Sequence, residues 1–502
     1  MIDKHKPGFF GPPPGEKQLA LYLEGLVGLA YAHMARSLYH FRRQSFVKGG
    51  YNLRKAWVTL KDAFEALKLQ ERSNFASDLE VTGCVNFGVG FFNFLVSLVP
   101  PSLQFLVKLL GFEGDRAAAL SQLTIAVESR CCKRIEATFC LFALRRYFTD
   151  DEEQADFLLD ELLEDYPDSP MVLYLCALMF RFKAQTDRSL SMLQHAVERV
   201  SHEQMKSTLN YHLGTTYVMT AQYEKALVHH KLFRETTSGE QFKVWSSFQS
   251  GVCRWLLSNG DKTDVVPFFQ YVLEKGKSDV PLEKMAMRKA KEFFKAGDKF
   301  SDFNSKLYRV QHIHEGQLWE EVLKQVKELL RPLATTPEEK AVCDYYQASA
   351  LFGLKRHHKA HKYYVRVLQA EAHVKHDNYT YIVPYTLAEL GETELMLGNL
   401  QRAKEFLKKA KKYEDYDWNN LLSVRISASM DKLARRESNA KAAQPTTATT
   451  TIATETTTMT ATTTTTTTAM TTKTTVTTTE DNTTATPAAT LAPVGATATS
   501  SS

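Results

Sequence analysis

Apolar residues recur at every third or fourth position through most of the chain, whereas the apolar–polar alternation of strands is scarce. This spacing predicts amphipathic α-helices, each with one apolar face for a core. Glycine and proline residues separate helical segments of roughly 12 to 18 residues. The pattern therefore predicts an all-α protein.

Small residues recur at a fixed offset, which indicates repeated helix pairs. Three pairs lie 12 residues apart: Gly214 and Ala226, Ala348 and Ala360, and Gly391 and Ala403. Small side chains at such positions let two helices approach closely, as in tetratricopeptide repeats of about 34 residues. A looser copy joins Ala177 to Ser189, and a candidate near Gly251 lacks the matching small residue.

These repeats predict a tetratricopeptide-like helical-repeat α-solenoid over residues 116–436. The region before it, 19–115, lacks the repeat and is expected to be a divergent helical part. The alternative is an irregular helical bundle in which the spacing arises by chance.

The longest uncharged stretch runs from Val81 to Val107. A membrane span needs about 20 apolar residues without a strong break, and Pro100-Pro101 interrupts a continuous helix here. We predict a helical hairpin over 81–110, and its place is open between a buried core, a membrane or lipid-droplet surface and a true span. Insertion into lipid would use apolar side chains of the first arm: Phe87, Phe91, Phe92, Phe94 and Leu95.

The two ends of the chain differ in composition from the body. From Pro445 to Ser502, 30 of 58 residues are threonine and four are charged. Such a segment contains too few large apolar residues to form a core. We predict a disordered Thr-rich tail over 437–502 and a flexible Pro/Gly-rich start over 1–18.

The charge of the chain is modest. The balance is 62 − 57 = +5 overall and 61 − 54 = +7 without the Thr-rich tail, which does not indicate a nucleic-acid-binding protein. The first residues do not resemble a secretory signal, and the seven cysteines include no Cys-x-x-Cys pair. These features favour reduced thiols in a cytoplasmic protein, with the nucleus also open.

Clusters of titratable residues offer little sign of catalysis or metal binding. His357 and His361 have the i, i+4 spacing of metal ligands, but lysine and arginine residues flank them and no nearby carboxylate completes a site. His312-Ile313-His314 is short and loop-like, the acidic run over 150–165 fits a solvated helix face, and the lysine run over 404–412 fits a helix C-terminus. Because common nucleotide-binding, hydrolase and metalloprotease motifs are missing, we expect no enzymatic activity, no cofactor and no metal.

The concave groove of the solenoid is the expected protein-binding surface. The first-helix positions that would contact a partner are Tyr211, Thr215, Tyr345, Ser349 and Glu392. None of them is a cation, which disfavours a clamp for a partner's terminal carboxylate. Tyrosines suit an extended or helical apolar segment better, and the alternative is that they only pack between helices.

Several segments together resemble one family. They are Ser45–Gly50, Asn86–Asn93 leading to Leu98–Pro101, Leu109–Arg116, Met287–Ala290 and His376–Pro384. The set resembles the tetratricopeptide repeat protein 39 family, which is similar to the fungal inclusion-body clearance proteins, over roughly Leu19 to Ala428. Family members usually carry further helical sequence before this point, so their first helix pair is expected to be missing here. The Thr-rich tail is not a family feature.

The resemblance implies a non-enzymatic helical-repeat adaptor with links to lipid handling and to clearance of protein inclusions. We therefore expect an intracellular scaffold that binds other proteins through its groove. The alternative is a peripheral membrane or lipid-droplet protein that inserts the 81–110 hairpin.

Overall fold

The computed structural model describes residues 15–442 except 43–44, 77, 98–113, 150, 238–239, 241, 259–260, 279, 375, 377 and 415. Helices, turns and bends account for the ordered structure of these residues, and no strand occurs among them. The predicted all-α repeat fold is confirmed. The Thr-rich segment from 443 onward and residues 1–14 lie outside the described part of the chain.

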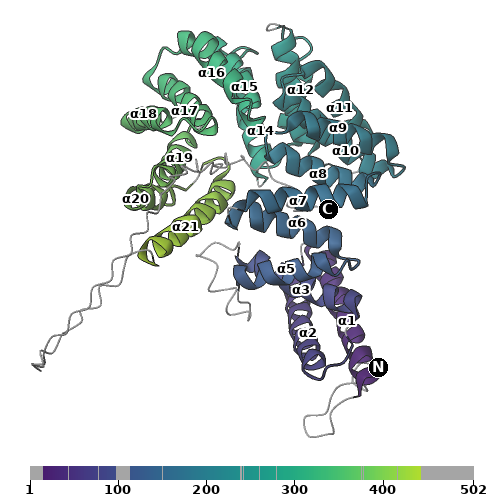
Figure 1. Cartoon of the computed structure of the whole chain (residues 1–502). Helices are drawn as coiled ribbons and strands as arrows, with labels where there is room; N and C mark the ends of the chain where they lie inside the picture. Colours follow the sequence, from purple (N-terminus) through teal and green to yellow (C-terminus); the bar gives the residue numbers. More distant parts are fainter. Residues whose placement is uncertain are drawn as a thin grey trace, which may run out of the picture.

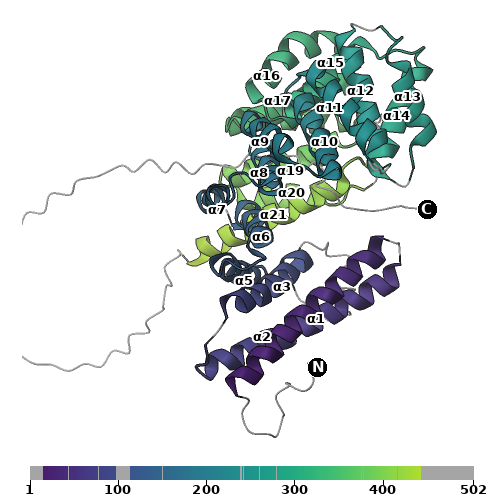
Figure 2. The ribbon, with the colours of Figure 1, turned by 90° about the vertical axis from the view of Figure 1, so that its right-hand side faces the viewer.

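The first helices form a long hairpin and a layer packed on it. Their bounds are α1 Glu16–Arg42, α2 Phe46–Arg72, α3 Leu79–Ser97, α5 Arg116–Glu128, α6 Arg134–Leu144, the π-helix η2 Arg145–Thr149 and α7 Glu152–Asp165. Helix α2 packs on α1, and α3 lies between this hairpin and α5. Figure 2 shows the α1–α2 hairpin at the opposite end of the molecule from α12–α17.

Helix pairs then follow one another around a superhelix (Figure 1). Their bounds are α8 Pro170–Phe182, α9 Thr186–Arg199, α10 Glu203–Met219, α11 Tyr223–Thr236, α12 Lys243–Leu257, α13 Val266–Lys275, α14 Pro281–Lys295, α15 Asp302–Glu315, α16 Trp319–Gln325, the π-helix η3 Val326–Leu330, the 3₁₀-helices η4 Arg331–Leu333 and η5 Glu371–His373, α17 Pro337–Gly353, α18 His357–Gln369, α19 Ile382–Met396, α20 Leu400–Ala410 and α21 Asn419–Ala442.

The boundaries differ slightly from the predicted ones. Helix α1 begins at Glu16 and α21 continues to Ala442, so the helical body extends beyond the predicted limits of 19 and 436. The first arm of the predicted 81–110 hairpin is α3. Its second arm, residues 102–110, lies outside the described residues.

Small residues hold the helix pairs close together. A Cβ atom added at Gly391 would lie 2.8 Å from Leu407 Cγ, and one added at Gly214 would lie 2.9 Å from His230 Nδ1. Ala348 and Ala360 are both fully buried between α17 and α18. The repeated offset in the sequence therefore marks the close contacts of α10–α11, α17–α18 and α19–α20.

Polar side chains define several helix starts. Asp115 accepts hydrogen bonds from the backbone of Ala117 and Ala118, and Thr336 and Glu339 form a reciprocal capping box at α17. Such caps satisfy backbone N–H groups that have no partner within the helix. They fix where α5 and α17 begin, and thereby the loops between consecutive helices.

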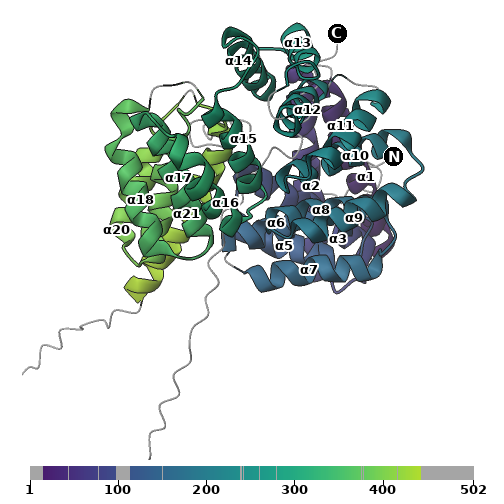
Figure 3. The ribbon, with the colours of Figure 1, turned by 90° about the horizontal axis from the view of Figure 1, so that it is seen from above.

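Helix α15 closes the superhelix on its own interior. It packs on α10 and α12 from the first half and on α17 from the second half, and Figure 3 shows it between these two parts. Gln317, which follows α15, donates a hydrogen bond to the Phe182 carbonyl oxygen at 3.2 Å. A Cβ at Gly316 would lie only 2.5 Å from the Met219 carbonyl oxygen, so only glycine allows this approach.

Ion pairs complete the closure. Arg288 of α14 contacts Asp417, just before α21, with 2.5 Å between Nη2 and Oδ2. Arg116 of α5 forms an ion pair with Asp431 of α21. The last helix is thus tied to both the first layer and the middle of the superhelix.

We predict that Gly316→Ala lowers the thermal unfolding midpoint, because the new methyl group would push α15 away from the Met219 carbonyl. Overpacking of this kind costs about 1–3 kcal/mol. The matched control is Gly50→Ala in α2, where nothing lies within 4 Å of the added Cβ, so helix propensity should raise stability slightly. Equal midpoints for the two variants, measured by circular dichroism, would contradict the close-approach argument.

Candidate functional site

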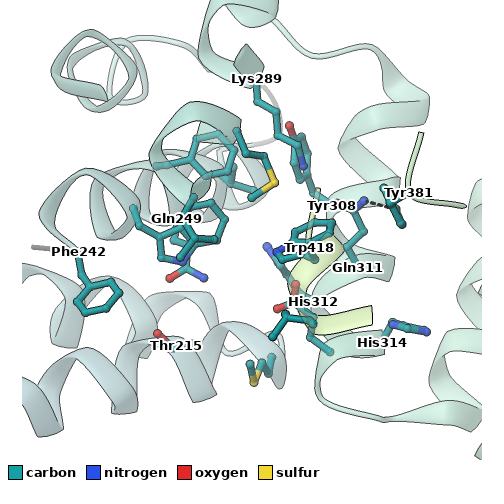
Figure 4. Close-up of a pocket in the computed structure, with 18 of the residues that line it drawn as sticks. Thr215, Phe242, Gln249, Lys289, Tyr308, Gln311, His312, His314, Tyr381 and Trp418 are labelled. Atoms are coloured by element: carbon teal, nitrogen blue, oxygen red, sulfur yellow. Dashed lines mark hydrogen bonds between the residues drawn. The ribbon is translucent and has the colours of Figure 1, made fainter. Parts of the chain in front are cut away.

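The interior of the superhelix contains a cavity of about 120 Å³, measured as space for the centres of water molecules. One water needs roughly 10–15 Å³ on this measure, so the cavity has room for several waters. Its lining comes from helices α8 to α21: Arg181, Tyr211, Thr215, Trp245, Phe248, Gln249, Lys289, Tyr308, Gln311, His312, His314, Glu315, Tyr345, Tyr346, Tyr381, Tyr385 and Trp418, among others. Figure 4 shows lining residues of the cavity as sticks, among them Gln249, Lys289 and Trp418.

Aromatic side chains form most of the cavity wall. The hydroxyl groups of Tyr346 and Tyr381 are 2.6 Å apart, and Gln311 donates a hydrogen bond to the Tyr381 hydroxyl at 3.3 Å. The rings of Tyr381 and Trp418 pack edge to face at 5.4 Å. Because the polar tip of the central tyrosine is satisfied within the wall, its ring is held in place.

Two buried cations face this aromatic wall. Arg181 is 5% exposed and its nearest hydrogen-bond acceptor is Thr216 Oγ1 at 3.4 Å, while Lys289 is 7% exposed and lies over the Tyr308 ring at 4.9 Å. Neither cation forms an ion pair within the described residues. Burial lowers the pKa of Lys289 to about 8 and lowers that of Arg181.

Helix α15 presents two histidines and a glutamate to the cavity, besides Tyr308. Burial lowers the pKa of both His312 and His314 to about 3, so both imidazoles are neutral. His314 Nε2 lies 2.8 Å from Ser349 Oγ. Burial raises the pKa of the Glu315 carboxyl to about 7, and Lys289 and Arg181 partly offset that effect. The cavity is therefore cationic near neutral pH.

Two polar atoms at the cavity are buried without a partner. Gln249 is 4% exposed, and its Oε1 accepts no hydrogen bond from the described residues. His212 Nε2 lies 3.0 Å from the Tyr174 hydroxyl, but its Nδ1 has no partner within the same residues. Buried polar atoms normally have partners, so these atoms are available to a ligand or to water.

Comparison with known families identifies the chain. A family model described as Iml2/Tetratricopeptide repeat protein 39 matches residues 27–320, which is more than half of the chain.

The chain belongs to this family.

Among solved structures, the chain is similar to one titled "Crystal Structure of P58(IPK) TPR Domain at 2.5 A". The match has 12% sequence identity and covers 68% of this chain and 98% of that chain. Its TM-score is 0.23, which is too low to bear on architecture or function.

Two segments that carried the resemblance to the Iml2/tetratricopeptide repeat protein 39 family meet at the cavity. Met287–Ala290 supplies Lys289, and His376–Pro384 supplies Tyr381. Arg288 Nε donates a hydrogen bond to Asn378 Oδ1 at 2.9 Å and so joins the two segments. These segments were the sequence signal for the cavity, although the sequence alone did not assign them a site.

The predicted groove residues separate into two sets. Tyr211, Thr215 and Tyr345 line the cavity, and Ser349 contacts it through His314. Glu392 lies elsewhere, because its carboxylate is bound by Arg425, with 2.6 Å between Oε2 and Nη2, and by Ser429. It ties α19 to α21 and is not a lining residue.

Other sequence-level interpretations need correction. His312 and His314 lie in helix α15, not in a loop, and both line the cavity. His361 has a carboxylate neighbour, since its Nε2 lies 3.0 Å from Glu394 Oε1, but the two do not form part of a three-residue metal cluster in the described chain. The acidic face of α7 is paired as well as solvated, for example through Asp160 and Arg188.

The cations were missed because they lie outside the repeat positions used for the prediction. The groove was expected to lack a cation at its first-helix positions, whereas Arg181 comes from the end of α8 and Lys289 from α14. The closure of the superhelix brings these side chains to one cavity. Repeat register within a single helix pair does not contain this information.

The five residues assigned to lipid insertion are mostly buried. Phe87, Phe92 and Phe94 are 3–7% exposed, Phe91 is half-buried and Leu95 is 43% exposed. Helix α3 is long and apolar enough to cross a membrane by length and composition: an 18-residue stretch of it has a mean hydropathy of 1.4, and 61% of that stretch is buried. In this fold Phe87, Phe92 and Phe94 therefore face protein.

We predict that Lys289→Met raises stability at pH 7. The pKa of Lys289 is about 8 in the folded protein and 10.5 in the unfolded chain, so the charged form destabilises the fold. The pKa shift corresponds to a free energy of unfolding that is higher in the variant by on the order of 3 kcal/mol at pH 7. The free energy of unfolding of the wild type should rise between pH 8 and pH 10.5, until the two proteins are equally stable.

Thermal melts across this pH range test the prediction. Lys291→Met is the matched control, because Lys291 lies on the same helix and is exposed. The control should melt like the wild type at every pH. A Lys289→Met variant that is less stable than the wild type at pH 7 would contradict the assignment of an unpaired charge.

Proposed function

We propose that the protein is a non-enzymatic scaffold that anchors partner proteins in the interior of its superhelix. The tetratricopeptide-repeat family supports a role in protein–protein interaction. The observation that carries the proposal is what converges in one cavity: two cations without an ion pair among the described residues, an amide oxygen that accepts no hydrogen bond from them, and an aromatic wall. A chain that only packed against itself would gain stability by replacing these groups with apolar ones.

The chemistry of the cavity wall determines which residues of a partner would bind there; we call these residues the anchor. Lys289 and Arg181 would bind a carboxylate, and Gln249 Oε1 would accept a hydrogen bond from a backbone or side-chain N–H group. The rings of Tyr345 and Trp418 would cover apolar or aromatic groups next to the acid. We infer that the anchor is an acidic residue beside an aromatic one in an extended segment of the partner.

We propose that the protein acts in the cytoplasm or the nucleus. All seven cysteines are free thiols, which suits the reducing cytoplasm or nucleus. The proposed links to lipid handling and to clearance of protein inclusions would depend on which partner is anchored. Proximity labelling in cells with wild type and Lys289→Met would name the partners that need the cavity.

We predict that the purified chain binds fluorescent peptides with an acidic residue next to an aromatic one, and binds poorly when lysine replaces the acid. The Lys289→Met variant loses one charge-assisted contact of about 1.5–3 kcal/mol. Its affinity for the acidic peptides should therefore be roughly tenfold or more below that of the wild type. Fluorescence polarisation measures both.

Two controls separate binding from folding. Lys291→Met should bind like the wild type, and Lys289→Met should be at least as stable as the wild type while binding less. Equal affinity for acidic and basic peptides, or unchanged affinity in Lys289→Met, would argue against the proposed anchor.

The second candidate function is attachment to a membrane or lipid-droplet surface through the 81–110 segment. The observation that favours it is the exposure of Leu95 beside half-buried Phe91 at one side of α3. Insertion of Phe87, Phe92 and Phe94 would require α3 to leave α2 and α5.

We predict that Leu95→Asp folds and leaves liposome flotation unchanged, because the scaffold proposal gives this exposed side chain no lipid contact. Phe92→Asp should misfold, since Phe92 packs on Trp57 with ring centroids 5.2 Å apart. If the wild type floats with liposomes and folded Leu95→Asp does not, the lipid function replaces the scaffold as the better account of α3.

A further inference from the structure

Far from the superhelix cavity, sulfur and oxygen ligands converge between α3 and the turn that joins α5 to α6. Glu80 and Cys84 lie one helical turn apart on α3, and Cys132 lies in the α5–α6 turn. Cys84 Sγ is 3.6 Å from Cys132 Sγ and 3.7 Å from Glu80 Oε1. The three potential ligand atoms lie within 4.8 Å of one another.

The backbone of the turn aims the carboxylate at the thiols. The Cys132 N–H donates hydrogen bonds to both Glu80 oxygens, at 3.0 and 3.1 Å. The chain reverses at Arg130, which has a left-handed φ of 52°. Non-glycine residues rarely adopt this conformation, so the turn is held in place by its surroundings.

A third thiol lies beside the cluster. Cys131 packs so closely on α3 that a Cβ added at Gly83 would lie 2.6 Å from its Sγ atom. Its thiol donates a hydrogen bond to the Ala126 carbonyl oxygen at 3.7 Å, so it is not counted among the ligands. Gly83 thus lets two consecutive cysteines of the turn reach the same turn of α3.

The spacing fits a small tetrahedral ion. Zinc binds thiolate sulfur at about 2.3 Å and carboxylate oxygen at about 2.0–2.2 Å. In a tetrahedron these bond lengths place neighbouring ligand atoms about 3.5–3.8 Å apart. The 3.6 Å and 3.7 Å separations around Cys84 agree with this geometry, and thiolates select zinc over magnesium or calcium.

An ion also has an entry path and surrounding support. A groove of about 710 Å³ between α1, α3 and α6 opens on Glu80, Cys84 and Cys132. The Tyr31 hydroxyl donates a hydrogen bond to the Cys84 carbonyl oxygen at 3.0 Å, which fixes the backbone of a ligand residue. Groups of this kind orient metal ligands.

We propose that Glu80, Cys84 and Cys132 bind a zinc ion. The ion ties helix α3, the first arm of the predicted 81–110 hairpin, to the α5–α6 turn. Binding displaces the protons of the thiols and stabilises the folded form, because the ligands come together only in that form. The site is independent of the superhelix cavity and of the scaffold function proposed for it.

Zinc content and cobalt spectroscopy test the proposal on the full chain. Protein purified under reducing conditions should bind one zinc ion per chain in a titration against a competing chelator. Cobalt(II) should give the near-ultraviolet absorption of thiolate coordination. Cys132→Ser should lower zinc affinity at least tenfold and remove the thermal shift that zinc causes in the wild type.

The control is Cys140→Ser, which removes a thiol from α6 that does not belong to the cluster; its zinc affinity should equal that of the wild type. Glu80→Gln gives a second variant at an exposed position, with circular dichroism as the check on folding. No zinc binding by the wild type would overturn the proposal. Equal affinity in Cys132→Ser, or a Cys84–Cys132 disulfide in the native protein, would also overturn it.

Discussion

The close approach of α15 to α10 is the contact on which the architecture depends. Gly316 leaves room for the Met219 carbonyl, and the ring of His312 packs edge to face on Tyr223 at 5.8 Å. This contact seals the superhelix with aromatic side chains from both halves of the chain. It also holds Lys289 and Arg181 away from bulk water and from counter-ions. One packing contact therefore both encloses the cavity and buries its two cations.

The charged interior conflicts with stability in a way that suggests selection for binding. An unpaired buried cation destabilises a fold, and an apolar side chain of similar size would normally replace it. Glu315 relieves the cost only in part, because burial also raises its own pKa to about 7. Proteins break local rules of this kind mainly at functional sites.

The sequence predicted the parts of the fold that depend on local contacts. Gly391 and Ala403 belong to one helix pair, so their spacing reports directly on that contact. Lys289 and Arg181 share no repeat, and only the closed superhelix brings them together. In the same way, Cys84 and Cys132 are 48 positions apart. The expectation that His312 lies in a loop was wrong, because the Ser301 cap begins a helix that contains it.

Helix α21 has a kinetic consequence. Its ion pair with Arg116 and the packing of Ala428 in the core of α3, α5 and α6 turn an open solenoid into a closed one. A ligand that enters the interior beside α21 has to wait until these contacts separate. Association should therefore be slower than the usual 10⁵–10⁷ M⁻¹s⁻¹ of open protein surfaces, and a captured segment should dissociate slowly for the same reason.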